Sequence, residues 1–313
     1  MAHHTLSPSP ETVHWGWFDY GLPPVLTVES GDRVTVKTVS GGPDNLPGDG
    51  YDIPPELFKI HEVSPRRLPG HILTGPIAVK GAVPGDVLEV KILDIRLRQD
   101  WGYTFMRPLS GALPGEFEVG EQMTVRLDRE KNTGLLPWGT ELPLRPFFGV
   151  MGVAPPAAWG SISSIQPRAH GGNLDNKEMI PGTSLYLPVL RDGAHLSLGD
   201  GHGVQGDGEV CTTAIETALE GEVELILHKG LGWTYPRAET ATHWITMGMD
   251  VDLDDAAKHA LRQMIEWITT LSNLTRTQAY MLMSLAADVR ITQLVNQEKG
   301  SHVMLPKTAL HGV

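Results

Sequence analysis

The sequence predicts a mostly β protein with a small helical part late in the chain. Of its 313 residues, 35 are glycine and 24 are proline, a content that favours many turns and short strands over long helices. Segments that alternate apolar and polar residues recur along the chain, as in residues 222–229. Apolar residues at three- to four-residue spacing predict two helices after residue 250.

The composition limits the classes of function. The length suits one large domain or two closely joined ones, and 41% apolar residues can form a core. The net charge is -12, and no basic cluster occurs beyond Arg66-Arg67, so we expect no nucleic-acid partner. The single cysteine, Cys211, permits no intrachain disulfide. No secretory signal is visible, and no segment approaches the roughly 20 apolar residues that span a bilayer. We therefore expect a cytoplasmic protein without a membrane partner.

Two hairpins are predicted in the first third of the chain. Residues 25–28 and 34–39 flank the turn Ser30-Gly31-Asp32, and residues 77–80 and 87–95 flank Pro84-Gly85-Asp86. Between them, residues 41–57 form a long Gly/Pro/Asp-rich loop, whose length suggests a lid over a site.

The later part of the chain contains the remaining strands and both helices. Apolar or alternating patterns predict strands over residues 185–190, 194–198, 210–215, 222–229 and 301–307. One helix begins at Asp254-Asp255, and a second begins near Thr275 and runs toward Asp288. We expect one domain over residues 1–313, with a β-rich part over 1–230 and an α/β portion over 231–313.

Residues 199–209 concentrate side chains that can do chemistry among five glycines. Asp200 and His202 are two residues apart, so on an extended segment they point to one face. Glu209 follows across a glycine turn, and Asp175 could add a ligand from the neighbouring polar turn. Zn²⁺ prefers His and carboxylate ligands. The alternative is a turn in which the Asp side chains cap backbone N–H groups.

Other chemical candidates are weaker. A Ca²⁺ loop of the EF-hand pattern is disfavoured because its third position is His202, a poor Ca²⁺ ligand. Cys211 lies in an apolar run, where a buried cysteine is usually inert. His71 and His170 could each be a metal ligand, a proton carrier or a structural residue, and His170 gains weight from the following Gly171-Gly172-Asn173.

Several motifs occur in the order typical of one family. They are Trp15 to Asp19 with Val28 to Asp32, His71 to Pro76 with Gly81 to Asp86, Gly149 to Pro155, His170 to Asp175, Gly199 to Glu209, and Asp288 to Gln293. On these motifs the sequence resembles the acetamidase/formamidase family over most of its length.

The resemblance implies a mainly β fold with a jelly-roll-like β-sandwich and a smaller α/β portion. It also implies hydrolysis of a short aliphatic amide, formamide or acetamide, to a carboxylate and ammonia, with a divalent metal, Zn²⁺ foremost, in a homo-oligomer. Two alternatives stay open. One is hydrolysis of another small C–N bond, as in a lactam or a urea-like compound. The other is a non-catalytic, metal-dependent jelly-roll that binds a small ligand.

Site roles are assigned on the positions that match the family motifs. Glu209 is either the proton-transfer group or a fourth metal ligand, and the glycines leave room for a substrate no larger than acetamide. The assigned residues are Asp175, Asp200 and His202 for the metal, Glu209 and His170 for catalysis, and Asn173, Gln205 and His71 for substrate binding.

Overall fold

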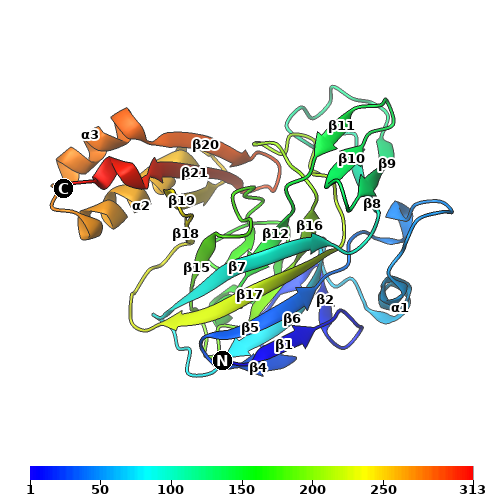
Figure 1. Cartoon of the computed structure of the whole chain (residues 1–313), viewed down its shortest axis with the longest axis horizontal. Helices are drawn as coiled ribbons and strands as arrows, with labels where there is room; N and C mark the ends of the chain where they lie inside the picture. The colour runs from blue at the N-terminus through cyan, green and yellow to red at the C-terminus, as the bar shows by residue number, and fades with distance from the viewer. Residues whose placement is uncertain (313) are drawn as a thin grey trace.

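A nine-stranded sheet is the largest element of the fold (Figure 1). The computed structural model describes residues 1–312. Neighbouring strands of this sheet are antiparallel except β1 and β5, which are parallel. In spatial order the strands are β1 (His3–Leu6), β5 (Asp32–Lys37), β17 (Leu219–His228), β7 (Val87–Leu97), β15 (Ser184–Pro188), β18 (Arg237–Glu239), β19 (His243–Asp250), β21 (Lys299–Pro306) and β20 (Asp288–Gln293).

A second sheet packs against the first. Its strands are β14 (Gly171–Asn173), β12 (Phe147–Gly152), β16 (Leu196–His202), β6 (Ile72–Val79) and β2 (Val13–Trp15), with β4 (Leu26–Val28) also paired to β6. Buried residues of both sheets form one apolar cluster, in which Val223 and Leu225 of β17 join Phe148 and Met151 of β12 and Leu198 of β16. The predicted mainly β fold is therefore confirmed, and its main core lies between two sheets.

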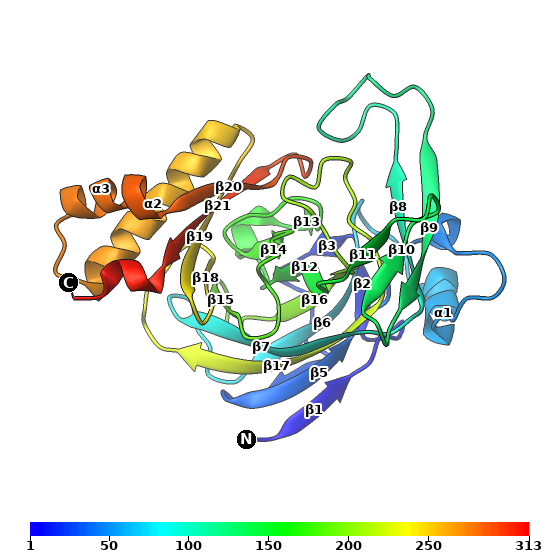
Figure 2. The same ribbon diagram turned by 45° about the horizontal axis from the view of Figure 1, so that its top comes forward.

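Smaller elements flank this sandwich. The connection between β8 and β9 extends well away from the body of the molecule (Figure 2). Helix α1 (Pro55–Val63) packs Leu57 and Ile60 against Trp15 and Ile72. The remaining elements are β8 (Trp101–Met106), β9 (Glu121–Asp128), β10 (Thr133–Leu135) and β11 (Glu141–Pro143) in one small sheet, β3 (Trp17–Phe18) with β13 (Ile162–Ser163), and the short 3₁₀ helices η1 (Pro43–Asn45), η2 (Ala157–Trp159) and η3 (Lys307–Leu310).

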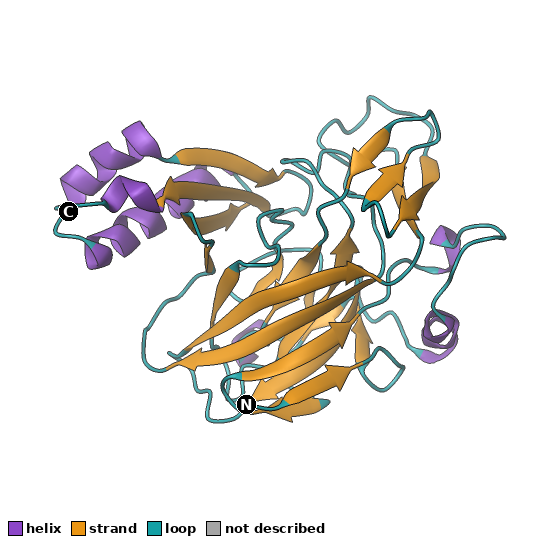
Figure 3. Ribbon diagram, in the orientation of Figure 1, coloured by secondary structure: helices purple, strands orange, loops and turns teal. Residues whose placement is uncertain are grey.

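Both late helices are present as predicted (Figure 3). Helix α2 (Leu253–Leu271) begins where the Asp252 carboxylate accepts the N–H groups of residues 254 and 255, and Thr275 caps α3 (Arg276–Ala286). The two helices pack against Val303 and Leu305 of β21. No helix within residues 1–312 combines the length and apolarity that a bilayer crossing requires.

Neither predicted hairpin forms. The first pair of strands separates, because β4 pairs with β6 in one sheet while β5 pairs with β1 and β17 in the other. The second pair, β6 and β7, is likewise divided between the two sheets. Each turn instead carries the chain from one layer to the other. In both, the Asp side chain accepts the N–H three residues earlier, Asp32 from Glu29 and Asp86 from Val83. Alternation of apolar and polar residues identifies a strand but not its partner. The sequence therefore could not distinguish a hairpin from two consecutive strands in different sheets.

The strand predicted over residues 210–215 is also wrong. These residues form turns and bends. Thr212 takes a positive φ of 75° and its N–H bonds back to the carbonyl of Glu209. Ile215 is nevertheless buried, in the core of the small β8–β11 sheet. The apolar run therefore reflects burial of an irregular segment.

Candidate active site

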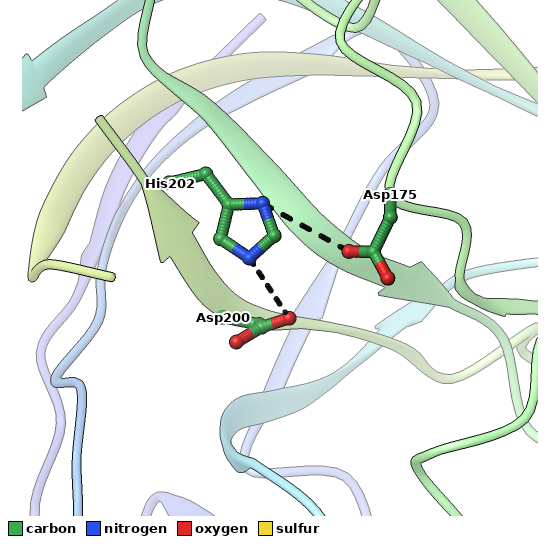
Figure 4. Close-up of side chains that lie close together, drawn as sticks. All are labelled: Asp175, Asp200 and His202. Atoms are coloured by element: carbon green, nitrogen blue, oxygen red, sulfur yellow. Dashed lines mark ion pairs between the residues drawn. The ribbon is translucent and has the colours of Figure 1, made fainter. Parts of the chain in front are cut away.

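The site forms where three strands of the second sheet lie side by side. Asp200 and His202 lie on β16, which pairs with β12, and Asp175 follows β14 on the other side of β12. Asp200 Oδ2 lies 3.3 Å from His202 Nε2, and Asp175 Oδ1 lies 3.9 Å from His202 Nδ1 (Figure 4). All three side chains are buried, and potential ligand atoms of the three lie within 4.8 Å of one another. Asp200 and His202, two residues apart on one strand, therefore lie close to Asp175 of the neighbouring turn, as the sequence predicts.

Two glutamates extend this cluster. Ligand atoms of His202, Glu209 and Glu216 also lie within 4.8 Å of one another, and Glu216 Oε1 is 3.4 Å from His202 Nε2. Sequence reasoning missed Glu216, because the preceding run was taken for an apolar strand. A carboxylate placed directly after six mostly apolar or small residues was the available signal. We call Asp175, Asp200, His202, Glu209 and Glu216 the acidic-histidine cluster.

Gln205 fixes the orientation of His202. Its Nε2 donates to the backbone carbonyl of Asp175 at 2.9 Å, so its Oε1 must be the atom 2.8 Å from His202 Nδ1. A carbonyl oxygen can only accept, so Nδ1 carries the hydrogen. The other nitrogen, Nε2, is directed at Asp200 and Glu216 and has no hydrogen-bond partner. Gln205 therefore positions the histidine, and the structure gives it no contact with the cavity described below.

Asn296 is a second positioning residue that sequence reasoning missed. Its side-chain amide donates to Asp175 Oδ2 at 2.5 Å. The backbone N–H of Asn296 bonds in turn to the Oε1 of Gln293, at the end of β20. Two backbone hydrogen bonds join the same segment to Gly208: the Gly208 N–H donates to the carbonyl of Thr292, and the Leu294 N–H donates to the carbonyl of Gly208. The turn between β20 and β21 is thereby attached to residues 199–209.

Burial and mutual charge shift the protonation of the cluster. Burial raises the pKa of Glu209 well above its usual value, and the charge of Asp175 adds to this. Burial likewise raises the pKa of Glu216 to about 7. Burial opposes protonation of His202, but the charges of Glu216 and Asp200 outweigh it and raise the pKa of His202 well above its usual value. Without a compensating cation, the cluster holds protons that its groups would not hold in water.

The chemistry of the cluster fits a divalent metal. Three of the buried polar atoms without a hydrogen-bond partner in residues 1–312 belong to the cluster: Asp175 Oδ1, His202 Nε2 and Glu209 Oε2. Buried polar atoms normally have a hydrogen-bond or metal partner, so three atoms without one in a single cluster indicate that the cluster binds a further group. One imidazole nitrogen with several carboxylates is a donor set that Zn²⁺ accepts.

The backbone is shaped for these side chains. Asp175, Asp200 and Glu209 all have positive φ values, of 45°, 56° and 44°. Non-glycine residues rarely adopt this conformation, and such residues concentrate at functional sites. Beneath the cluster, a Cβ on Gly149 would lie 2.5 Å from Asp175 Oδ1 and 2.7 Å from Asp200 Oδ2. Only glycine lets the two carboxylates approach the strand this closely.

A cavity of about 540 Å³ lies over the cluster. Asp200, Glu209 and Glu216 line it from the cluster, and Gly41 to Asn45 line it from the loop that sequence analysis treats as a candidate lid. Its volume lies in the range of pockets that hold drug-sized ligands. The five glycines of residues 199–209 do not line this cavity, so they do not limit the substrate to the size of acetamide as the sequence suggested.

Two residues assigned to substrate binding line this cavity. His71 Nε2 lies 3.6 Å from Asp200 Oδ2. Asn173 donates its side-chain N–H to the carbonyl of Ile165 at 3.2 Å, while its Oδ1 is buried without a partner. The free group of Asn173 is therefore an acceptor, suited to the N–H of an amide.

His170 lies apart from the cavity. It is fully buried, with its ring edge-on to Phe18 at 4.9 Å and to Trp159 at 6.1 Å between ring centroids. Burial lowers its pKa to about 3, so the ring is neutral. Its nitrogens contact no residue of the acidic-histidine cluster, and nothing in the geometry supports the catalytic role that the sequence suggests.

Fold and site together define a β-sandwich protein with a buried carboxylate–histidine centre under an open cavity. The chain is 28% identical to a formamidase of Methylophilus methylotrophus over 256 residues, covering 63% of this chain and 59% of that protein. It is 30% identical to an acetamidase of Mycolicibacterium smegmatis over 200 residues, covering 45% and 49%. The structure superposes on a crystal structure of an acetamidase from Bacillus halodurans with a TM-score of 0.86 and 31% identity, over 99% of this chain and 100% of that one.

The model of the acetamidase/formamidase family matches residues 3–161 and 156–310. The chain belongs to the acetamidase/formamidase family. It spans about half to three fifths of the length of the two sequence relatives named above.

Proposed function

We propose that the chain is an amidase that hydrolyses a primary amide to a carboxylate and ammonia. The observation that supports this most strongly is the acidic-histidine cluster, with three unpartnered polar atoms, beneath a cavity. Family membership supports the same reaction, because named relatives are a formamidase and an acetamidase.

The reaction adds the oxygen of a water molecule to the amide carbon and breaks the carbon–nitrogen bond. Glu209 lines the cavity with one unpartnered oxygen. Its ionised form, which a cation held by the cluster would favour, can take a proton from the water and deliver it to the departing nitrogen. Asn173 Oδ1 accepts an N–H of the amide and orients it. Burial raises the pKa of Tyr103 above its usual range, so its phenol stays protonated and can donate to the carbonyl oxygen as negative charge develops there.

Asp175, Asp200 and His202 would hold a divalent metal, Zn²⁺ in the first instance, with Glu216 beside them. A metal bound there would act as a Lewis acid toward the amide or the water. Gln205 keeps the hydrogen of His202 on Nδ1, so that Nε2 presents its lone pair to the cluster.

A substrate panel with metal analysis tests the proposal. Ammonia release from formamide, acetamide, a lactam and urea is measured before and after treatment with a chelator, and after Zn²⁺ is restored. We expect release from linear amides that falls on chelation and returns with metal. His202→Ala should lose metal and activity together, while the surface control His3→Ala keeps both. Full activity after complete metal removal would contradict the proposed role of the metal. Failure to release ammonia from any of the compounds would contradict the proposed amidase activity.

Two properties outside the site belong to the same proposal. The exposed apolar residues Tyr280, Met281 and Leu285 on α3 and Val289 and Ile291 on β20 support a homo-oligomer. A lone cysteine, Cys211, is compatible with the cytoplasmic location that the sequence predicts.

A further inference from the structure

The cavity over the acidic-histidine cluster carries two arginines that amide hydrolysis does not use. Arg66 and Arg107 both line it. Within residues 1–312, neither guanidinium has a carboxylate oxygen within 4.0 Å, although the chain holds 37 acidic against 25 basic residues. Arg67, Arg191, Arg237 and Arg262 have no such pair either, but among the arginines without one only Arg66 and Arg107 line this cavity.

Both arginines are exposed to solvent at the cavity, and the surroundings hold the side chain of Arg107. Arg66 pairs through its backbone with Trp15, at the end of β2. The guanidinium of Arg107 stacks on the ring of Phe105, with its Cζ 4.1 Å from the ring centroid. Stacking occupies the flat face of a guanidinium and leaves its N–H groups free in the plane, which suits recognition of a carboxylate.

The acidic groups of the cavity divide into two sets. Asp200, Glu209 and Glu216 belong to the cluster at its floor, and Asp44 is exposed on its rim. A substrate with its amide at the floor must extend its remaining part toward the rest of the lining. Formamide and acetamide would leave most of the cavity of about 540 Å³ unfilled.

We infer that the substrate is a primary amide whose acyl chain ends in a carboxylate, bound by Arg66 and Arg107, as in the monoamide of a short dicarboxylic acid. The inference rests on the proposed amidase function and names its substrate class. The reaction balances as before: water adds to the amide carbon, ammonia leaves, and the product is a dicarboxylate. The distal carboxylate takes no part in bond changes and serves only in binding.

The test compares monoamides with neutral amides of equal chain length. Malonamate, succinamate and glutaramate are paired with propionamide, butyramide and valeramide, and the readout is the ratio of kcat/KM within each pair. We expect the carboxylate-bearing member of at least one pair to be preferred. In the double variant Arg66→Gln/Arg107→Gln that ratio should fall by roughly five- to tenfold, the size expected for two solvent-exposed charge contacts.

A neighbouring arginine provides the control. Arg67 stacks on Trp17, with its Cζ 4.2 Å from the ring, and does not line the cavity. Arg67→Gln should keep the ratio, and raising the salt concentration should reduce it in the unmodified protein. Because the readout is a ratio, a general loss of activity in the double variant does not imitate the effect.

Calorimetric binding of succinamate and butyramide separates this inference from the proposed function. Arginine-dependent binding of succinamate without hydrolysis would support the carboxylate subsite and contradict the amidase. Hydrolysis of neutral amides, with no preference for any monoamide or with a preference that survives the double variant, would overturn the subsite and leave the amidase standing.

Discussion

Gly149 lies directly beneath the acidic-histidine cluster, and its replacement by alanine is a stringent test of the site. The new Cβ would lie 2.5 Å from Asp175 Oδ1, 2.7 Å from Asp200 Oδ2 and 2.8 Å from His202 Cε1. Ordinary contacts of a Cβ begin near 3.4 Å, so each neighbour must move by roughly 0.6 to 0.9 Å. Since φ at Gly149 is not positive, backbone strain plays no part and the effect is steric.

Displacements of this size should disable chemistry more than folding. Misplacing reacting groups by about 1 Å can reduce a rate by roughly 10²-fold. Overpacking in a well-filled interior costs about 1–3 kcal/mol. We therefore expect Gly149→Ala to lose about 10²-fold in amide hydrolysis and to bind metal more weakly, while remaining folded with a lower Tm.

The assay measures ammonia release, bound metal and thermal unfolding on the same preparations. Gly48→Ala is the matched control, because a Cβ there meets nothing within 4 Å and its φ is not positive. This control should match the unmodified protein in all three measurements. If Gly149→Ala kept its metal and hydrolysed amides within twofold of the normal rate, the arrangement of carboxylates described here would be refuted.

Three further changes address other residues. Glu216→Gln keeps the shape of the side chain but removes a carboxylate from His202, so amide hydrolysis should fall by about 10²-fold or more with little change in Tm; a normal rate would show that the cluster works without it. Gln205→Leu removes the acceptor for His202 Nδ1, and titration of the metal should show roughly 10- to 100-fold weaker binding, with unchanged affinity contradicting the positioning role. His14 is buried between the Trp17 carbonyl and the Ser197 hydroxyl, and burial lowers its pKa to about 4, so the unfolded chain binds the extra proton between pH 6.5 and pH 4. The free energy of unfolding should therefore fall by about 3 kcal/mol from this group as the pH drops through that window. Denaturant unfolding at a series of pH values should show that the free energy of unfolding of His14→Gln changes less steeply with pH than that of the unmodified protein. An equal dependence of the unfolding free energy on pH in the two proteins would show that the fold does not hold His14 neutral.

Local patterns predicted the elements of this fold better than their pairing. The helix that begins after Asp252 and the one that Thr275 caps follow from side-chain caps and apolar spacing, which act within a few residues. The turns at Asp32 and Asp86 also formed as turns. Their flanking strands joined different sheets, because partner choice depends on contacts with β1, β17 and β15, which come from elsewhere in the chain.

The same limit applies to the site. Asp200 and His202 share one strand face, so their spacing alone predicts their proximity. Asn296 reaches Asp175 across 121 positions of sequence, and no local pattern in residues 294–298 indicates that contact. Gln205 is close to His202 in sequence, but which of its atoms faces the ring depends on the Asp175 carbonyl.

The attachment of Asn296 to Asp175 has a consequence for synthesis on the ribosome. His71, Asp175 and Asp200 all precede Asn296 in the chain, and the amide that orients Asp175 emerges about a hundred residues after Asp200. Asn296 lies in the turn between β20 and β21. These two strands and β19 complete the large sheet only at this stage. A nascent chain can therefore assemble most of its sandwich while Asp175 still lacks the amide that orients it. The acidic-histidine cluster would therefore reach its final arrangement only after most of the sandwich core has formed.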